Sequence, residues 1–215
     1  MGQTPESRGT KQRILDAALE LFSVQGFSGT SVEQIASKVG IKAPSLYKHF
    51  KSKQDIFDAI LEEMDHHHQQ QVEGLNLSPL DPQRDVELFR GMSAEGLCER
   101  VIAMVRFIVH DRQYAQFRRM LRIEQYHQAR IAQLYSDRYM RLYLDYHTRL
   151  FEGLMQAAVL HNDDAEVLAL QYFSPILVAI DTIDRHPEQE DQTLELVRRH
   201  VIHFMHEYGT TPKEG

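Results

Sequence analysis

Hydrophobic residues recur at intervals of three and four along most of the chain, which is the spacing of one face of an α-helix. The first stripe predicts a helix from about Thr10 to Val24, and Gly26 and Gly29 then break it. No stretch alternates polar and apolar residues as a strand does, and no segment repeats. The pattern therefore predicts an all-α protein.

Two short helices joined by a tight turn are predicted between Ser31 and Phe50. Ser31 is followed three residues later by Gln34, which is the spacing of a capping box, and Gly40 supplies a left-handed stop. Pro44 suits the first position of a second helix, where its missing N–H is not needed, although Ala43 before it is a poor N-cap. Two short helices with such a turn are typical of a helix-turn-helix.

The exposed face of the second helix is small, cationic or hydroxyl-bearing, and no carboxylate occurs between Gln34 and Gln54. A helix-turn-helix places the start of its second helix against base edges, while flanking donors hold phosphates. The bases would meet Lys42, Ala43 and Ser45, and the phosphates Tyr47, Lys48, His49 and Lys53. A solvated basic face on an ordinary helical core would show the same pattern, so the pattern alone leaves both interpretations open.

Ser52 and Asp55 predict a second cap, which opens a helix to about Val72. The triplet His66–His68 lies on this helix, where consecutive side chains point about 100° apart and cannot share one metal. No metal site is predicted there. Residues 74–93 are expected to form a loop or a short-helix connection.

The rest of the chain is predicted to be helical, with apolar stripes over residues 97–109, 117–123, 134–160, 164–183 and 194–208. Pro175 is expected to kink the fourth of these helices or to restart it with Ser174 as the cap.

Five landmarks in the first quarter of the chain resemble the N-terminal domain of the TetR family of transcriptional regulators. They are Lys11–Phe22, Gly26–Phe27, Thr30–Ala36, Leu46–Phe50 and Lys53–Phe57, in the order and spacing of that family. The resemblance implies an N-terminal three-helix DNA-binding domain over residues 8–68 and a larger helical ligand-binding and dimerisation domain over residues 69–215.

It also implies a homodimer that a small molecule controls, with DNA contacts from two groups of residues. Base contacts would come from the start of the second short helix, and phosphate contacts from residues around it. The full set is Thr30, Ser31, Lys42, Ala43, Pro44, Ser45, Tyr47, Lys48, His49 and Lys53.

Aromatic and methionine positions in the body either fill a core or line a ligand cavity. The candidates for a ligand are Met104, Phe107, His110, Phe117, Met120, Tyr126, Tyr143, Phe151 and Phe173, among which His110 or Tyr126 would supply a polar contact. The last two stripes either complete the core or form a four-helix bundle with a second copy, and the resemblance favours the dimer. Its interface would contain Ile176, Ile180, Ile183, Leu194, Val197, Val201 and Phe204.

Composition places the chain among globular proteins, with 42% hydrophobic and 26% charged residues over 215 positions. No run approaches the ~18 apolar residues of a membrane span, and no secretory signal is recognisable, so a cytoplasmic protein without a membrane partner is expected. Residues 1–53 carry eight Lys or Arg and four Asp or Glu, which gives a charge of +4. Because the net charge of the chain is −7, the remaining residues carry −7 − 4 = −11. A basic end on an acidic body favours approach to a polyanion by that end.

A recognisable catalytic centre is excluded, because the chain has no phosphate-cradling glycine loop, HExxH, CxxC or nucleophile elbow. The sequence therefore predicts no enzyme and no cofactor. It predicts a regulator, more specifically a repressor, that reads a near-palindromic double-stranded DNA operator and is released by a small apolar or amphipathic effector. The alternative is a helical carrier of an apolar ligand without a regulatory role.

Overall fold

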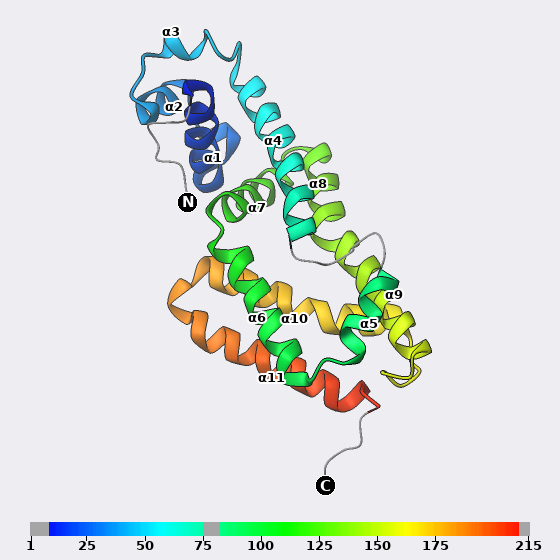
Figure 1. The fold of residues 1–215 in the computed structure, drawn as a ribbon. Coiled ribbons are helices and arrows are strands. Elements are labelled where there is room, and N and C mark those ends of the chain that lie inside the picture. Colours follow the sequence, from blue (N-terminus) through cyan, green and yellow to red (C-terminus); the bar gives the residue numbers. More distant parts are fainter. Residues whose placement is uncertain (1–8, 75–81, 211–215) are drawn as a thin grey trace. The chain divides into compact units, whose positions relative to one another are not determined.

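The computed structural model describes residues 9–74 and 82–210, with side chains described outside residues 65–74 (Figure 1). All regular secondary structure of the described chain is helical, apart from one isolated bridge between Leu160 and Gly209, and the predicted all-α class is confirmed. The elements are α1 (Thr10–Gly29), α2 (Val32–Val39), α3 (Ala43–Leu46), α4 (Lys53–Gly74), α5 (Pro82–Arg90), α6 (Ala94–His110), α7 (Arg112–Glu124), α8 (Ala129–Ser136), the π-helical η2 (Asp137–Arg141), α9 (Leu142–Gln156), α10 (Ala165–Arg185), the 3-10 helix η3 (Pro187–Gln189) and α11 (Glu190–Tyr208).

These helices form two compact units. The first contains α1–α4 as far as residue 71, together with residues 112–135, which comprise α7 and most of α8. The second contains α5, α6, η2, α9, α10 and α11. The division at residues 68 and 69 stays a prediction. The predicted His66–His68 face lies outside the described side chains.

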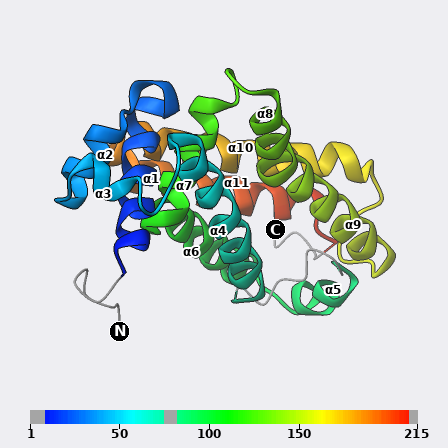
Figure 2. The same cartoon turned by 90° about the horizontal axis from the view of Figure 1, so that it is seen from above.

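The first unit is built on α1, which packs against α2 and α7. Its core includes the fully buried Ile14, Ile35 and Leu46. The rings of Phe22, Phe27 and Phe57 meet with centroids 5.2–5.8 Å apart and close the core beside the end of α1. Figure 2 shows α2 and α3 together at the edge of this unit.

Local sequence signals set the ends of these helices. The Ser31 hydroxyl accepts from the Gln34 N–H at 3.1 Å, and the Gln34 side chain accepts from the Ser31 N–H at 2.7 Å, so the predicted capping box is confirmed. Gly40 adopts the predicted left-handed conformation, with φ 79°. Ser52 accepts from the N–H of Asp55 at 3.1 Å and caps α4 as predicted.

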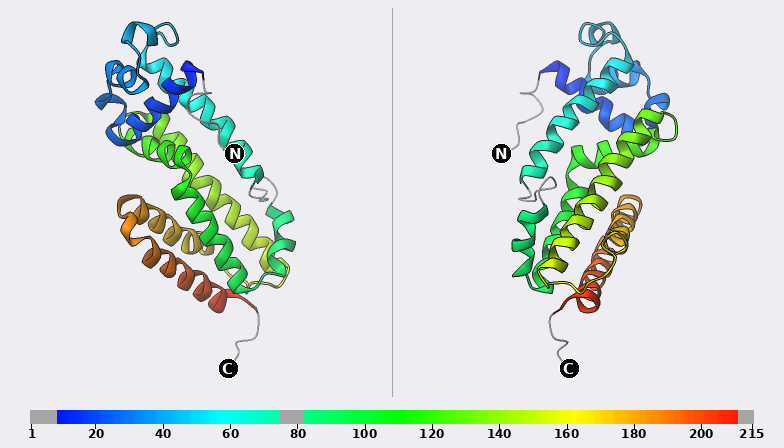
Figure 3. Two further views of the ribbon diagram at one scale, coloured as in Figure 1. Left: turned by 60° about the vertical axis from the view of Figure 1, so that its left-hand side comes forward. Right: turned by 90° about the vertical axis from the view of Figure 1, so that its right-hand side faces the viewer.

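The second unit has α10 at its centre, packed against α6, α9 and α11, while α5 lies on α9. Figure 3 shows α10 and α11 running side by side. Among the described helices, α10 alone is long and apolar enough to cross a membrane by composition, but here it is the core helix of this unit.

The predicted restart of α10 at Ser174 is wrong, because the helix continues through Pro175. Proline removes one N–H donor from the helix ladder. Beside it, the Tyr172 carbonyl accepts from the Nε2 of His200 at 2.9 Å, which ties α10 to α11 at the interruption.

Candidate DNA-reading surface and ligand cavity

Helix α3 presents one buried face and one exposed face. Leu46 and Phe50 are buried in the first unit, with exposed fractions of 0% and 6%. Lys42 stands at the N-cap and Pro44 is the second residue of the helix, so the second helix begins one residue before the start predicted at Pro44. The helix itself ends at Leu46, earlier than the Phe50 expected from the sequence, and continues as turns.

The opposite face of α3 carries most of the residues predicted to touch DNA. Lys42, Pro44, Tyr47, Lys48 and His49 are exposed, and Ala43 and Ser45 are partly exposed. No described residue hydrogen-bonds or pairs with the polar side chains of this surface. Its cations and hydroxyls are therefore available to an external polyanion.

Two residues predicted to touch phosphates turn inward instead. Thr30 is 2% exposed and donates its hydroxyl to the Gly26 carbonyl at 2.8 Å. The Lys53 ammonium donates to the carbonyls of Phe27 and Thr30, each at 2.6 Å, and lies 4.3 Å from the centroid of the Phe27 ring. These side chains fix the bend between α1 and α2. The remaining predicted residue, Ser31, is exposed, with its hydroxyl in the capping box.

A buried carboxylate joins α7 to the bend in α1. Glu124 is 2% exposed, and its Oε1 accepts from the Phe27 N–H at 2.7 Å while Oε2 accepts from Gln128 at 3.2 Å. The donor is available because Gly26, with φ 74°, breaks the helical ladder of α1. A hydrogen bond from α7 thus stabilises the end of α1, which precedes the helix-turn-helix.

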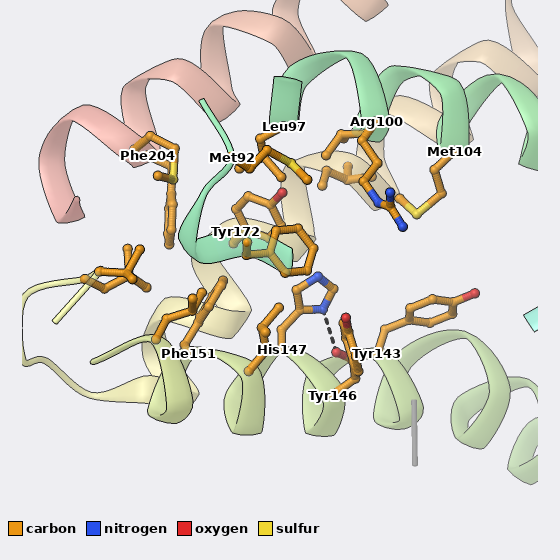
Figure 4. A pocket seen from close by; sticks show the side chains of 18 of the residues that line it. Met92, Leu97, Arg100, Met104, Tyr143, Tyr146, His147, Phe151, Tyr172 and Phe204 are labelled. Atoms are coloured by element: carbon orange, nitrogen blue, oxygen red, sulfur yellow. Dashed lines mark hydrogen bonds between the residues drawn. The ribbon is translucent and has the colours of Figure 1, made fainter. Parts of the chain in front are cut away.

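The second unit encloses a cavity of about 370 Å³ between α5, α6, α9, α10 and α11. This volume lies within the range typical of small-molecule sites. In Figure 4 the α6 side chains lie on one side and the α9 side chains on the other. The lining is predominantly apolar and aromatic and consists of Phe89, Met92, Leu97, Arg100, Val101, Ala103, Met104, Phe107, Leu142, Tyr143, Tyr146, His147, Leu150, Phe151, Leu154, Val159, Leu160, Tyr172, Ile176, Phe204 and Met205.

The structure brings some of the ligand candidates together and separates others. Met104, Phe107, Tyr143 and Phe151 line the cavity, and Phe173 lies behind it, with its ring stacked 5.2 Å from that of Tyr143. The other four candidates lie elsewhere. Phe117 and Met120 are buried in α7 of the first unit, Tyr126 is 83% exposed, and His110 is exposed and paired with Glu190.

Sequence reasoning missed most of the lining, including His147 and Tyr172. A usable signal was present in α9, where Tyr143, Tyr146, His147, Leu150, Phe151 and Leu154 follow one helical stripe.

Burial sets the protonation states of three polar side chains that line the cavity. Tyr146 donates its hydroxyl to the buried Asp85 at 2.7 Å, and burial together with this bond raises the pKa of Tyr146. Burial lowers the pKa of His147 to about 4, although its hydrogen bond to the Tyr143 carbonyl acts in the opposite direction. Burial also raises the pKa of Tyr172. All three side chains are therefore neutral near pH 7.

The residues predicted for a dimer interface are already buried within one chain. Their exposed fractions are 0–6%, and two of them, Ile176 and Phe204, line the cavity. The same two helices expose other apolar side chains: Val167, Leu170 and Val178 on α10, and Leu196 and Ile202 on α11.

Comparison with known proteins identifies the chain at the level of family. The model of bacterial regulatory proteins of the tetR family matches residues 14–60. TtgW, an uncharacterized HTH-type transcriptional regulator of Pseudomonas putida, is 31% identical over 116 residues, which are 54% of this chain and 75% of TtgW. SrpR, an HTH-type transcriptional regulator also of Pseudomonas putida, is 32% identical over 116 residues, and the match spans 54% of this chain but only about half, 47%, of SrpR.

Solved structures of low identity show the same fold over nearly the whole chain. A TetR-family regulator from Mesorhizobium loti MAFF303099 aligns with 97% of this chain and 100% of its own, with a TM-score of 0.61 and 18% identity. A complex of SmeT with triclosan covers 95% and 93% at TM-score 0.59 and 19% identity. AibR bound to isovaleryl coenzyme A and operator DNA covers 88% and 96% at TM-score 0.56 and 17% identity.

A helix-turn-helix with an exposed cationic face, in a chain that also encloses an apolar cavity, is typical of helix-turn-helix transcriptional regulators. Within that class, the chain belongs to the TetR family. The family model describes bacterial regulatory proteins, and both Pseudomonas putida relatives are named as HTH-type transcriptional regulators.

Proposed function

We propose that this protein is a cytoplasmic, homodimeric repressor that leaves its operator when a small apolar or amphipathic effector enters the cavity of the second unit. The observation that carries the proposal is the exposed face of α3, whose polar side chains have no partner among the described residues. A phosphate backbone supplies the charge that complements such a face, and binding to it would release the counterions of the DNA.

The proposed DNA contacts divide into two groups. Lys42, Ala43, Pro44 and Ser45 begin the reading helix and face base edges, because residues at that end of the helix enter the major groove. Tyr47, Lys48, His49 and Ser31 hold phosphates. Thr30 and Lys53 act by fixing the bend before α2, since both donate to backbone carbonyls.

An effector role for the cavity rests on its size and lining. Its apolar and aromatic walls suit a small hydrophobic molecule rather than a metal or a nucleotide. Two proteins of the same fold support the idea, since SmeT was solved with triclosan and AibR with isovaleryl coenzyme A and operator DNA. For the effector to release the DNA, it has to bind the DNA-free protein more tightly than the DNA-bound protein. Such a difference in binding free energy is typically ~1–3 kcal/mol.

The homodimer is proposed to form through the exposed apolar side chains of α10 and α11. Two symmetric copies would place two reading helices on a near-palindromic operator, with half-sites about one or more helical turns apart. The exposed Val178 and Leu196, with 64% and 57% exposed, are better placed for such a contact than residues buried in the chain's own core.

A gel-shift titration tests the proposal. The full-length protein is mixed with the DNA that flanks its own gene, and with a site selected from random duplexes, at two salt concentrations and with random competitor. A competitor-resistant complex that weakens steeply with salt is expected. The absence of any specific complex with selected DNA would contradict the proposal and favour a helical carrier.

A further inference from the structure

The cavity contains a ring nitrogen that no described residue uses as a hydrogen-bond acceptor. His147 projects from α9 into the cavity (Figure 4), and its Nδ1 lies 2.7 Å from the carbonyl oxygen of Tyr143. A carbonyl can only accept, so Nδ1 carries the proton and Nε2 presents a lone pair. No described residue donates a hydrogen bond to Nε2.

The imidazole stays neutral under working conditions, so Nε2 remains an acceptor. The rings of Tyr146, Phe151, Tyr172 and Phe173 surround it, with centroids 5.2–5.8 Å away. This apolar setting disfavours the imidazolium ion and lowers the pKa to about 4. Aromatic faces next to a neutral acceptor suit a planar, apolar ring that carries one hydrogen-bond donor.

The charged side chains near His147 are few and do not favour an ionic ligand. Arg100 is the only Lys or Arg, and no Asp or Glu belongs to the lining of the cavity in the described chain. The Asp85 carboxylate and the Arg100 guanidinium both act electrostatically on the Tyr146 hydroxyl, in opposite directions, and the effect of Asp85 is the larger. The Tyr146 hydroxyl is itself committed to Asp85.

We propose that the effector is a neutral hydroxylated aromatic compound of the phenol class, whose hydroxyl donates to Nε2 of His147 while its ring lies against the surrounding aromatic side chains. The proposal rests on the effector role of the cavity proposed above. According to this proposal, His147 is the residue that makes the cavity prefer a hydroxylated ring over analogues without a hydroxyl.

Calorimetric titration of the full-length protein with three probes tests this assignment. The probes are 2-naphthol, its methyl ether and naphthalene, which share the ring system but differ in whether they can donate. The wild-type protein should bind 2-naphthol about tenfold more tightly than either analogue, because only 2-naphthol pairs with Nε2. In His147→Phe the preference should disappear, while His147→Gln, which keeps an acceptor oxygen, should retain part of it.

His127→Phe is the matched control, because His127 is exposed just after the end of α7 in the other unit and should leave the preference unchanged. Thermal unfolding of each variant checks that it folds. Equal wild-type affinity for all three probes would overturn the His147 assignment but leave the cavity as an effector site. Binding of none of them would also overturn it.

A gel shift on the same preparations separates this outcome from failure of the proposed function. If the protein binds its operator normally and ignores the probes, only the ligand class is wrong. If it binds no selected DNA, the regulatory proposal itself fails.

Discussion

Two lysines of the first unit show how neighbouring cations can serve different purposes. Lys48 is exposed just after α3 and has no hydrogen bond or ion pair with a described side chain, whereas Lys53 donates to two carbonyls at the end of α1 and lies over the ring of Phe27. Charge and position in the sequence are similar for both residues. Only the packing distinguishes a cation available to phosphate from one that fixes the backbone.

Substitution of each lysine should therefore give a different result. Lys48→Ala should reduce the slope of log affinity against log salt by about 1 and leave the free energy of unfolding unchanged. Lys53→Met should lower the free energy of unfolding by about 1–3 kcal/mol, since charged hydrogen bonds to backbone are lost.

Gel shifts over a range of salt, together with urea unfolding, measure both quantities. Arg149→Ala, on the exposed surface of α9, is the control for removal of a surface cation. If Lys53→Met lowered the salt slope and left the stability unchanged, Lys53 would be a phosphate contact as the sequence suggested.

His147 should make stability depend on pH. Its pKa in the folded protein, about 4, lies below the ordinary value of 6.5, so the unfolded chain takes up the proton first as pH falls. The free energy of unfolding should decrease between about pH 6.5 and pH 4, by up to about 3 kcal/mol, and this contribution should level off below pH 4. Urea unfolding of the wild type and of His147→Phe across this range should show a weaker decrease in the variant. Identical profiles would show that His147 titrates normally.

At the scale of elements, the end of α1 depends on one glycine. Gly26 has φ 74° and ψ 171°, a region almost confined to glycine, and a Cβ there would lie 3.0 Å from Glu124 Oε1 and 3.1 Å from Ile123 Cγ2. Gly26→Ala should thus lower the free energy of unfolding by about 1–3 kcal/mol and weaken operator binding.

The control is Gly91→Ala, where no atom lies within 4 Å of the added Cβ and φ is not positive. Thermal unfolding and gel shifts compare the two variants. Equal stability of both would mean that the bend in α1 tolerates a side chain.

Helix ends were predictable from the sequence because caps are local. The capping box at Ser31, the left-handed Gly40 and the Ser52 cap each involve residues at most four apart, and all three appear as expected. The continuous α10 was not predictable, because proline lowers helix propensity locally while packing against three neighbouring helices holds the helix together.

The candidate sites were predictable only in part, for the same reason. The α3 surface follows from the helix-turn-helix pattern, but the inward orientation of Thr30 and Lys53 depends on backbone carbonyls at the end of α1, to which both side chains donate. Periodicity identifies an apolar stripe without naming what it packs against. The family resemblance assigned Ile176 and Phe204 to a dimer contact, and within one chain they line the cavity.

At the scale of the whole molecule, we expect the proposed dimer to form through the exposed apolar side chains of α10 and α11 and not through their buried apolar stripes. Val178→Asp places a charge on the exposed face of α10 and should convert the proposed dimer to monomers with little loss of protomer stability. Sedimentation velocity measures the change, and operator affinity should fall with it. Val24→Asp, at a 78% exposed position on α1, is the control. A dimeric Val178→Asp protein would exclude this face as the interface.

The hydrogen bond between Glu124 and Phe27 decides which residues a chimaera with another regulator's DNA-reading helices has to exchange together. A crossover near residue 71 would set a foreign α1 against the α7 of this chain. Unless the incoming helix were broken at the same place, Glu124 would stay buried without its backbone donor, at a cost of several kcal/mol. The transferable module is therefore discontinuous: a chimaera that inherits residues 1–71 should inherit residues 112–135 with them.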